Sequence, residues 1–119
     1  MAVSIEELKK ASDSLKYALS EPYSDIVRDA AIQRFEFCTE LAWKVLRKKM
    51  GSSSVAPKAI VREAAQQGLI ENPVQWIRYI DARNLTSHTY NEDTARQVFE
   101  IVKNFLPDLE QLLPKLEDF

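Results

Sequence analysis

The sequence predicts an all-α fold: an antiparallel four-helix up-and-down bundle with an additional short helix. Only two glycines and five prolines occur among 119 residues, which leaves few turn formers for a β fold and favours helices. Apolar residues recur at three- and four-residue steps, the period of a buried helical face. The connections between these stretches are short, so consecutive helices should lie antiparallel. The length suits one domain with a single core, spanning residues 1–119.

The first helix is expected over residues 5–20. Ser4 and Glu7 have the Ser-x-x-Glu spacing of a capping box, in which each side chain satisfies a free backbone N–H group of the other residue. Glu21-Pro22 ends the pattern, because the residue before a proline disfavours helical geometry. The buried stripe consists of Leu8, Ala11, Leu15, Ala18 and Leu19.

A long second helix should begin after Ser24, a good N-cap residue, and end at Gly51. Phe37, Leu41 and Trp43 widen its apolar surface beyond one stripe, which suggests contacts on more than one side. The main stripe is formed by Val27, Ala31, Phe35, Cys38, Ala42, Val45 and Leu46.

Two helices should follow the long one. Pro57 suits the first turn of a short helix that Gly68 closes. Asn72 can cap the next helix, in which Pro73 takes the first position and which runs toward Arg83.

The last helix should begin after Asn91, an N-cap candidate followed by acidic residues that suit a first turn. Pro107 and Pro114 interrupt its apolar pattern, and we expect them to kink or break the helix. Its buried stripe runs through Val98, Ile101, Val102, Phe105, Leu109, Leu112, Leu113 and Leu116.

Composition excludes several classes of function. A net charge of −2 argues against coating nucleic acid through a broad basic surface. Cys38 has no partner cysteine, so we expect a buried thiol and a reducing compartment. There is no apolar run of membrane-spanning length and no apolar signal region, which predicts a soluble, cytoplasmic protein without a membrane partner. One histidine and no cysteine cluster argue against a metal site, and no cofactor motif is found.

The segment from Arg83 to Tyr90 holds the candidate functional residues. Asp81, Asn84 and His88 are spaced i, i+3 and i+7, which places them on one face of a helix. Arg83 and Tyr90 are seven residues apart on a neighbouring face.

Arg83 and His88 would point about 140° apart on a regular helix. They converge only if the helix ends between them. Thr86, Ser87 and Thr89 are poor residues for a helix interior, so we expect the helix to unwind there.

Converging Arg, Asn and His side chains suit a phosphodiester ligand. Arg83 would clamp the phosphate, Asn84 would donate a neutral hydrogen bond, and His88 would donate or accept a proton near neutral pH. This chemistry suits metal-independent RNA cleavage by a 2′-hydroxyl.

The segment Arg83-x-x-x-x-His88-x-Tyr90 resembles the Arg-x(4 to 6)-His-x-Tyr motif of the HEPN superfamily of small helical proteins. Three further blocks are similar to its nucleotidyltransferase substrate-binding branch, which is related to HepT toxins. These blocks are Phe35 to Lys44, Pro57-Lys58 with Arg62-Glu63-Ala64, and Gly68-Leu69-Ile70.

The resemblance implies a homodimer, with the motif near the dimer interface, and a partner that is a minimal nucleotidyltransferase of the MntA type. It also implies roles for the motif residues. Arg83 and His88 correspond to residues associated with ribonuclease activity, and Tyr90 corresponds to the acceptor of AMP added by the transferase.

Three interpretations follow, and we rank them in this order. The chain is the non-catalytic partner subunit that presents substrate to the transferase, in a HepT/MntA-like toxin–antitoxin type pair. Alternatively, it is a metal-independent HEPN ribonuclease toxin that AMPylation of Tyr90 neutralises, with RNA or a nucleotide as its ligand. Lastly, it is a structural bundle in which Arg83 pairs with a carboxylate such as Asp81 and His88 caps a helix.

Overall fold

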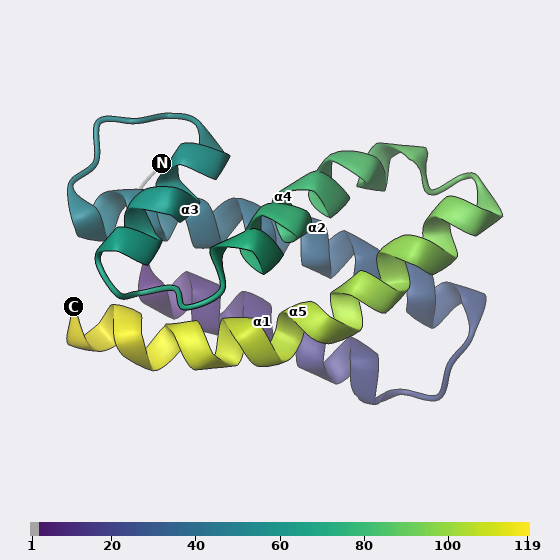
Figure 1. The fold of residues 1–119 in the computed structure, drawn as a ribbon. Helices are drawn as coiled ribbons and strands as arrows, with labels where there is room; N and C mark the ends of the chain where they lie inside the picture. Colours follow the sequence, from purple (N-terminus) through teal and green to yellow (C-terminus); the bar gives the residue numbers. More distant parts are fainter. Residues whose placement is uncertain (1–2) are drawn as a thin grey trace.

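The computed structural model describes residues 3–119, and every regular element in that range is helical (Figure 1). This confirms the predicted all-α class. A short 3₁₀ helix, η1, lies between the last two α-helices. The elements are α1 (Ile5–Ser20), α2 (Asp25–Met50), α3 (Pro57–Gln66), α4 (Pro73–Leu85), η1 (Thr86–His88) and α5 (Glu92–Asp118).

Helices α1, α2, α4 and α5 run alternately in opposite directions along the bundle, as predicted (Figure 1). α2 and α5 pack against each other, α1 packs against both, and α4 packs against both from another side. The short α3 contacts α2 and α4. The long central helix α2 therefore has neighbours on several sides, which accounts for the burial of Leu41, whereas Phe37 stays exposed.

Three predicted N-caps are present. The Ser4, Ser24 and Asn91 side chains accept hydrogen bonds from backbone N–H groups three residues ahead, at 3.2, 3.0 and 3.1 Å. Asn72 precedes α4 as predicted, but its side chain makes no capping bond and donates instead to Asp108 Oδ2 at 3.2 Å. Its φ of −125° and ψ of 66° differ from the extended geometry typical of a capping residue.

Helix α5 continues unbroken through Pro107 and Pro114, so the expectation of a break is wrong. It bends where its colour passes from green to yellow (Figure 1). Both prolines are exposed, so the backbone groups that they leave unpaired can meet solvent. The opposite face buries Phe105, Leu109 and Leu112, and this packing outweighs the local cost of the prolines.

An aromatic cluster of Phe35, Trp76, Tyr79 and Phe105 joins α2, α4 and α5, with edge-to-face ring pairs whose centroids are 5.0 to 5.6 Å apart. The Tyr79 hydroxyl donates to the backbone oxygen of Asn104 at 3.1 Å and also contacts the Asp108 carboxylate. These contacts fix α4 against α5, and α4 carries the first residues of the candidate site.

Over residues 3–119, no helix combines the length and the apolar character that crossing a membrane requires.

Candidate functional site

Helix α4 ends at Leu85, between Arg83 and His88, which confirms the predicted unwinding. Two threonine hydroxyls stabilise the change to η1. Thr86 Oγ1 donates to the Arg83 carbonyl at 2.7 Å, and Thr89 Oγ1 donates to the Thr86 carbonyl at 2.9 Å. Local side-chain bonds of this kind compete with the regular α-helical pattern.

Arg83 points toward α2 and forms an ion pair with Glu40. Arg83 Nη2 lies 2.5 Å from Glu40 Oε2, while Trp43 Nε1 donates to the other carboxylate oxygen, also at 2.5 Å. Arg83 Nη1 further contacts Asn84 Oδ1 at 3.4 Å. Arg83 thus pairs with a carboxylate, as the third interpretation expected, but the carboxylate is Glu40 and not Asp81. Asp81 binds Lys58 Nζ at 2.7 Å instead.

His88 and Tyr90 lie on the exposed turn before α5. Their ring centroids are 6.3 Å apart, and 87% of Tyr90 is exposed. Within the described residues, neither the imidazole nor the phenol has a hydrogen-bond partner. His88 therefore does not cap a helix with its side chain. Only its carbonyl takes part in the turn, where it accepts from the Asn91 N–H at 3.2 Å.

The structure thus divides the predicted site residues into separate groups. Arg83 and Asn84 lie together beside α2, and His88 and Tyr90 lie together on the turn. Asp81 forms an ion pair with Lys58 of α3. No hydrogen bond joins the Arg83 and His88 side chains within the part of the chain that is described. In this structure Arg83 is paired with Glu40, while His88 is exposed on the turn.

Two carboxylates that the sequence analysis did not single out belong to the surroundings of Arg83. Glu40 binds it directly. Glu36 Oε2 lies 3.2 Å from Thr86 Oγ1, whose single proton is shared between this carboxylate and the Arg83 carbonyl. Glu36, Glu40 and Arg83 line a cavity of about 320 Å³ together with Gln33 and Phe37. The sequence feature that could have identified them is the spacing Glu36-x-x-x-Glu40, which places both carboxylates on one face of the helix.

Arg28 of α2 binds the residue that follows the turn. Its side chain is 5% exposed, and it contacts Glu92 Oε1 at 2.6 Å and Asp29 Oδ1 at 3.1 Å. The hydrogen bond to Glu92 raises the pKa of the guanidinium above its ordinary value, although burial acts in the opposite direction. Arg28 thereby ties α2 to the first residue of α5, two residues beyond Tyr90.

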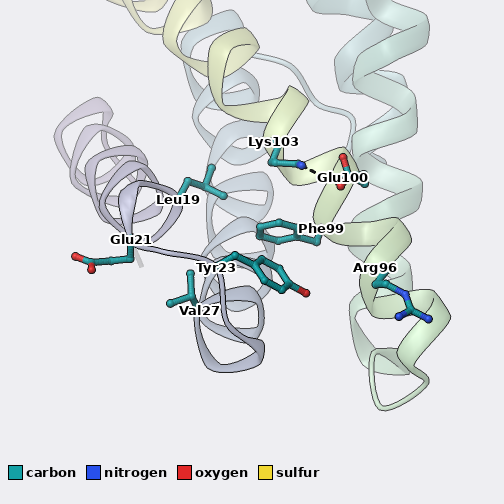
Figure 2. Close-up of a pocket in the computed structure, with 8 residues that line it drawn as sticks. All are labelled: Leu19, Glu21, Tyr23, Val27, Arg96, Phe99, Glu100 and Lys103. Carbon is teal, nitrogen blue, oxygen red and sulfur yellow. Dashed lines mark ion pairs between the residues drawn. The ribbon is translucent and has the colours of Figure 1, made fainter.

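A second cavity, of about 420 Å³, lies between the α1–α2 connection and α5 (Figure 2). Tyr23 and Phe99 meet edge to face inside it, with ring centroids 5.4 Å apart. Lys103 Nζ lies 2.9 Å from Glu100 Oε1 at its rim. No residue of the segment from Arg83 to Tyr90 lines this cavity, so it is separate from the candidate site.

No cluster of three or more metal-binding side chains occurs within residues 3–119.

Comparison with known proteins gives consistent results. Residues 3–118 match the family model described as nucleotidyltransferase substrate binding protein like. A probable ribonuclease HepT of Haemophilus influenzae is 35% identical over 100 residues, which cover 77% of this chain and 68% of that protein.

Two solved structures share the fold and much of the sequence. A Thermus thermophilus protein is 40% identical with a TM-score of 0.82, over 92% of this chain and 98% of that one. A Haemophilus influenzae protein is 30% identical with a TM-score of 0.85, over 96% of this chain and 99% of that one. It is described as having the fold of a substrate binding domain of a nucleotidyltransferase. The chain therefore belongs to the nucleotidyltransferase substrate-binding protein family.

Proposed function

We propose that this chain is the helical partner subunit of a separate minimal nucleotidyltransferase of the MntA type, and that Tyr90 is the residue on which the transferase acts. Family membership supports a transferase partner. The observation that carries the proposal is the position of Tyr90, whose side chain is 87% exposed at the tip of a turn. An acceptor for a second enzyme must protrude in this way.

The reaction transfers AMP from ATP to the phenol. Tyr90 Oη attacks the α-phosphorus of ATP, the bond from that phosphorus to the bridging oxygen breaks, pyrophosphate leaves, and the phenolic proton is released. The turn holds its shape through the Asn91 cap and the contact between Arg28 and Glu92. An ordered turn presents the acceptor in a defined position, which reduces the entropy lost when the transferase binds.

The test incubates the chain with its cognate minimal nucleotidyltransferase and ATP and measures the intact mass. We expect addition of one AMP group to the wild type and none to Tyr90→Phe. Tyr17→Phe is the matched control, because Tyr17 is also 66% exposed but lies on α1, and it should be modified normally. Absence of both a stable complex and a mass increase would contradict the proposal.

A second function, metal-independent RNA cleavage, is favoured by one specific observation: the 35% identical relative is described as a probable ribonuclease HepT. In this proposal Arg83 stabilises charge on the phosphodiester, and His88 exchanges a proton with the 2′-hydroxyl or the leaving group. Because Arg83 is paired with Glu40 on α2 while His88 is exposed on the turn, we propose that a homodimer completes the site.

The two functions are separated by expressing the chain alone, without any transferase. The ribonuclease proposal expects growth arrest and RNA cleavage for the wild type and neither for His88→Ala. Unchanged growth and intact RNA with both proteins would leave only the partner-subunit function. His88 is exposed, so its replacement should not alter folding.

A further inference from the structure

The group that neutralises Arg83 in this structure is Glu40. Its carboxylate lies 2.5 Å from Arg83 Nη2 and also accepts from Trp43 Nε1. Arginine binds carboxylates and phosphates through the same planar set of donors. Glu40 therefore occupies the position at which a phosphate group would contact Arg83.

The ion pair with Glu40 does not satisfy every donor of the Arg83 guanidinium. Its Nε atom is buried and has no hydrogen-bond partner among residues 3–119. The side chains of Arg83 and Glu40 are 35% and 32% exposed, and both line the 320 Å³ cavity. The guanidinium and the Glu40 carboxylate are therefore both accessible to a ligand that enters this cavity.

The charge around Arg83 opposes the binding of a further anion. Glu36 and Glu40 line the cavity together with one arginine, so the formal charge of its lining is −1. A phosphate that bound without any rearrangement would lie in the same cavity as two carboxylates, and like charges repel. Removing Glu40 from Arg83 relieves part of this repulsion.

We propose that Glu40 is an intramolecular competitor for the phosphate-binding position of Arg83, and that a phosphate group binds there by displacing its carboxylate. This inference rests on the proposed binding of phosphate by Arg83. It gives Glu40 a role in specificity. A ligand carboxylate gains nothing by replacing another carboxylate, and a phosphodiester has the same single charge. A phosphate dianion, such as inorganic phosphate or a terminal phosphate, offers more charge and a third oxygen. Phosphate dianions should therefore compete most effectively.

Trp43 provides a direct reporter of the displacement. Its indole N–H donates to Glu40, while Trp76, the only other tryptophan, is 3% exposed in the core. In a ¹H–¹⁵N NMR titration of the full chain with inorganic phosphate at constant ionic strength, the Trp43 indole signal should shift and saturate. The Trp76 signal should stay in place. The spectrum of Trp43→Phe, which lacks the Trp43 indole signal, identifies the two signals. Sodium acetate, a carboxylate, should produce no shift.

Three variants test the assignment, with phosphate affinity read from backbone amide shifts around residues 83–86. Glu40→Gln should bind phosphate roughly tenfold more tightly than the wild type, because one competing charge is removed while hydrogen bonding is kept. Glu36→Gln is the matched control: it lines the same cavity but is bonded to Thr86, so its effect should be clearly smaller. Arg83→Gln should abolish binding.

The outcomes separate this inference from the function on which it rests. If Glu40→Gln binds phosphate no more tightly than the wild type, while Arg83→Gln still abolishes binding, the competitor role is wrong and the Arg83 site stands. If Glu36→Gln and Glu40→Gln raise the phosphate affinity equally, the cause is the general loss of negative charge and not competition for Arg83. If Glu40→Gln binds no phosphate, or binding survives Arg83→Gln, both the competitor role and the proposed phosphate site are overturned.

Discussion

Cys38 lies fully buried in the core, on the inner face of α2. Burial raises the pKa of its thiol to about 12, because the apolar surroundings disfavour the thiolate. The folded protein thus keeps a proton that the unfolded chain releases above about pH 8.5. This contribution to stability is fully present below that pH and is lost as the pH rises toward the folded pKa.

We therefore expect the free energy of unfolding of the wild type to fall above about pH 8.5, by at most about 1.4 kcal/mol per pH unit for this one group. Urea unfolding at about pH 8 and about pH 10 measures the change. Cys38→Ala should be less stable than the wild type at both pH values, because it leaves a cavity. Its free energy of unfolding should, however, fall less between the lower and the higher pH. Equal losses in the two proteins would contradict the role given to the thiol.

The local sequence around Arg83 predicts where α4 ends but not which residue Arg83 binds. The unwinding at Thr86 was predictable, because threonine hydroxyls bond to the local backbone. The partner of Arg83 was not. Asp81 and Glu40 are both carboxylates, and only the packing of α4 on α2 decides which of them Arg83 reaches. Forty-three residues separate Arg83 from Glu40 in the chain, and no local pattern reports such a contact.

At the level of whole elements, the start of α5 depends on Asn91. Its side chain caps the helix directly after Tyr90. We expect Asn91→Ala to lower the free energy of unfolding by about 1 kcal/mol, because a backbone N–H loses its partner. Asn72→Ala is the matched control, since Asn72 also precedes a helix but makes no capping bond. Asn72→Ala should lower the free energy of unfolding by less, because only an exposed hydrogen bond to Asp108 is lost.

Chemical denaturation of the two variants measures both values. A larger loss for Asn72→Ala than for Asn91→Ala would contradict the difference in capping. The same pair has a functional readout. If an ordered turn matters for presenting Tyr90, Asn91→Ala should slow AMP addition and Asn72→Ala should not.

Helix positions were largely predictable because periodicity and caps are local signals, and the bounds of α1 and the N-caps of α2 and α5 follow from them. Pro107 shows the limit of such reasoning. A proline in the interior of an isolated helix costs about 3 kcal/mol. In α5 the residues around it, Phe105 and Leu109, are both fully buried, and tertiary packing keeps the helix continuous.

For the molecule as a whole, the exposed face of α2 suggests self-association. Phe37 is 63% exposed and contributes to three neighbouring cavities, including the one that holds Arg83 and Glu40. Aromatic side chains are enriched in protein interfaces. A second copy on this face would also approach the Arg83 site.

We predict that light scattering at micromolar concentration gives the mass of a dimer for the wild type and of a monomer for Phe37→Glu. The stability of the isolated fold should change little, because Phe37 is not part of the core. Val74→Glu is the matched control, since Val74 is 70% exposed on α4 and lines none of these cavities. It should remain dimeric. A monomeric wild type would count against a composite site built from two subunits.

The beginning of α1 and the end of α5 lie at one end of the bundle, joined by an ion pair between Lys9 and Glu117, and the turn with His88 and Tyr90 lies at the other (Figure 1). This arrangement matters for any engineered fusion. The bundle is 39 Å long, so a Gly/Ser tether from either terminus would need on the order of 50 residues for its root-mean-square length to match that distance. A transferase joined by a shorter tether would sample Tyr90 at a low effective concentration, whereas an affinity tag at either terminus would leave the acceptor unobstructed.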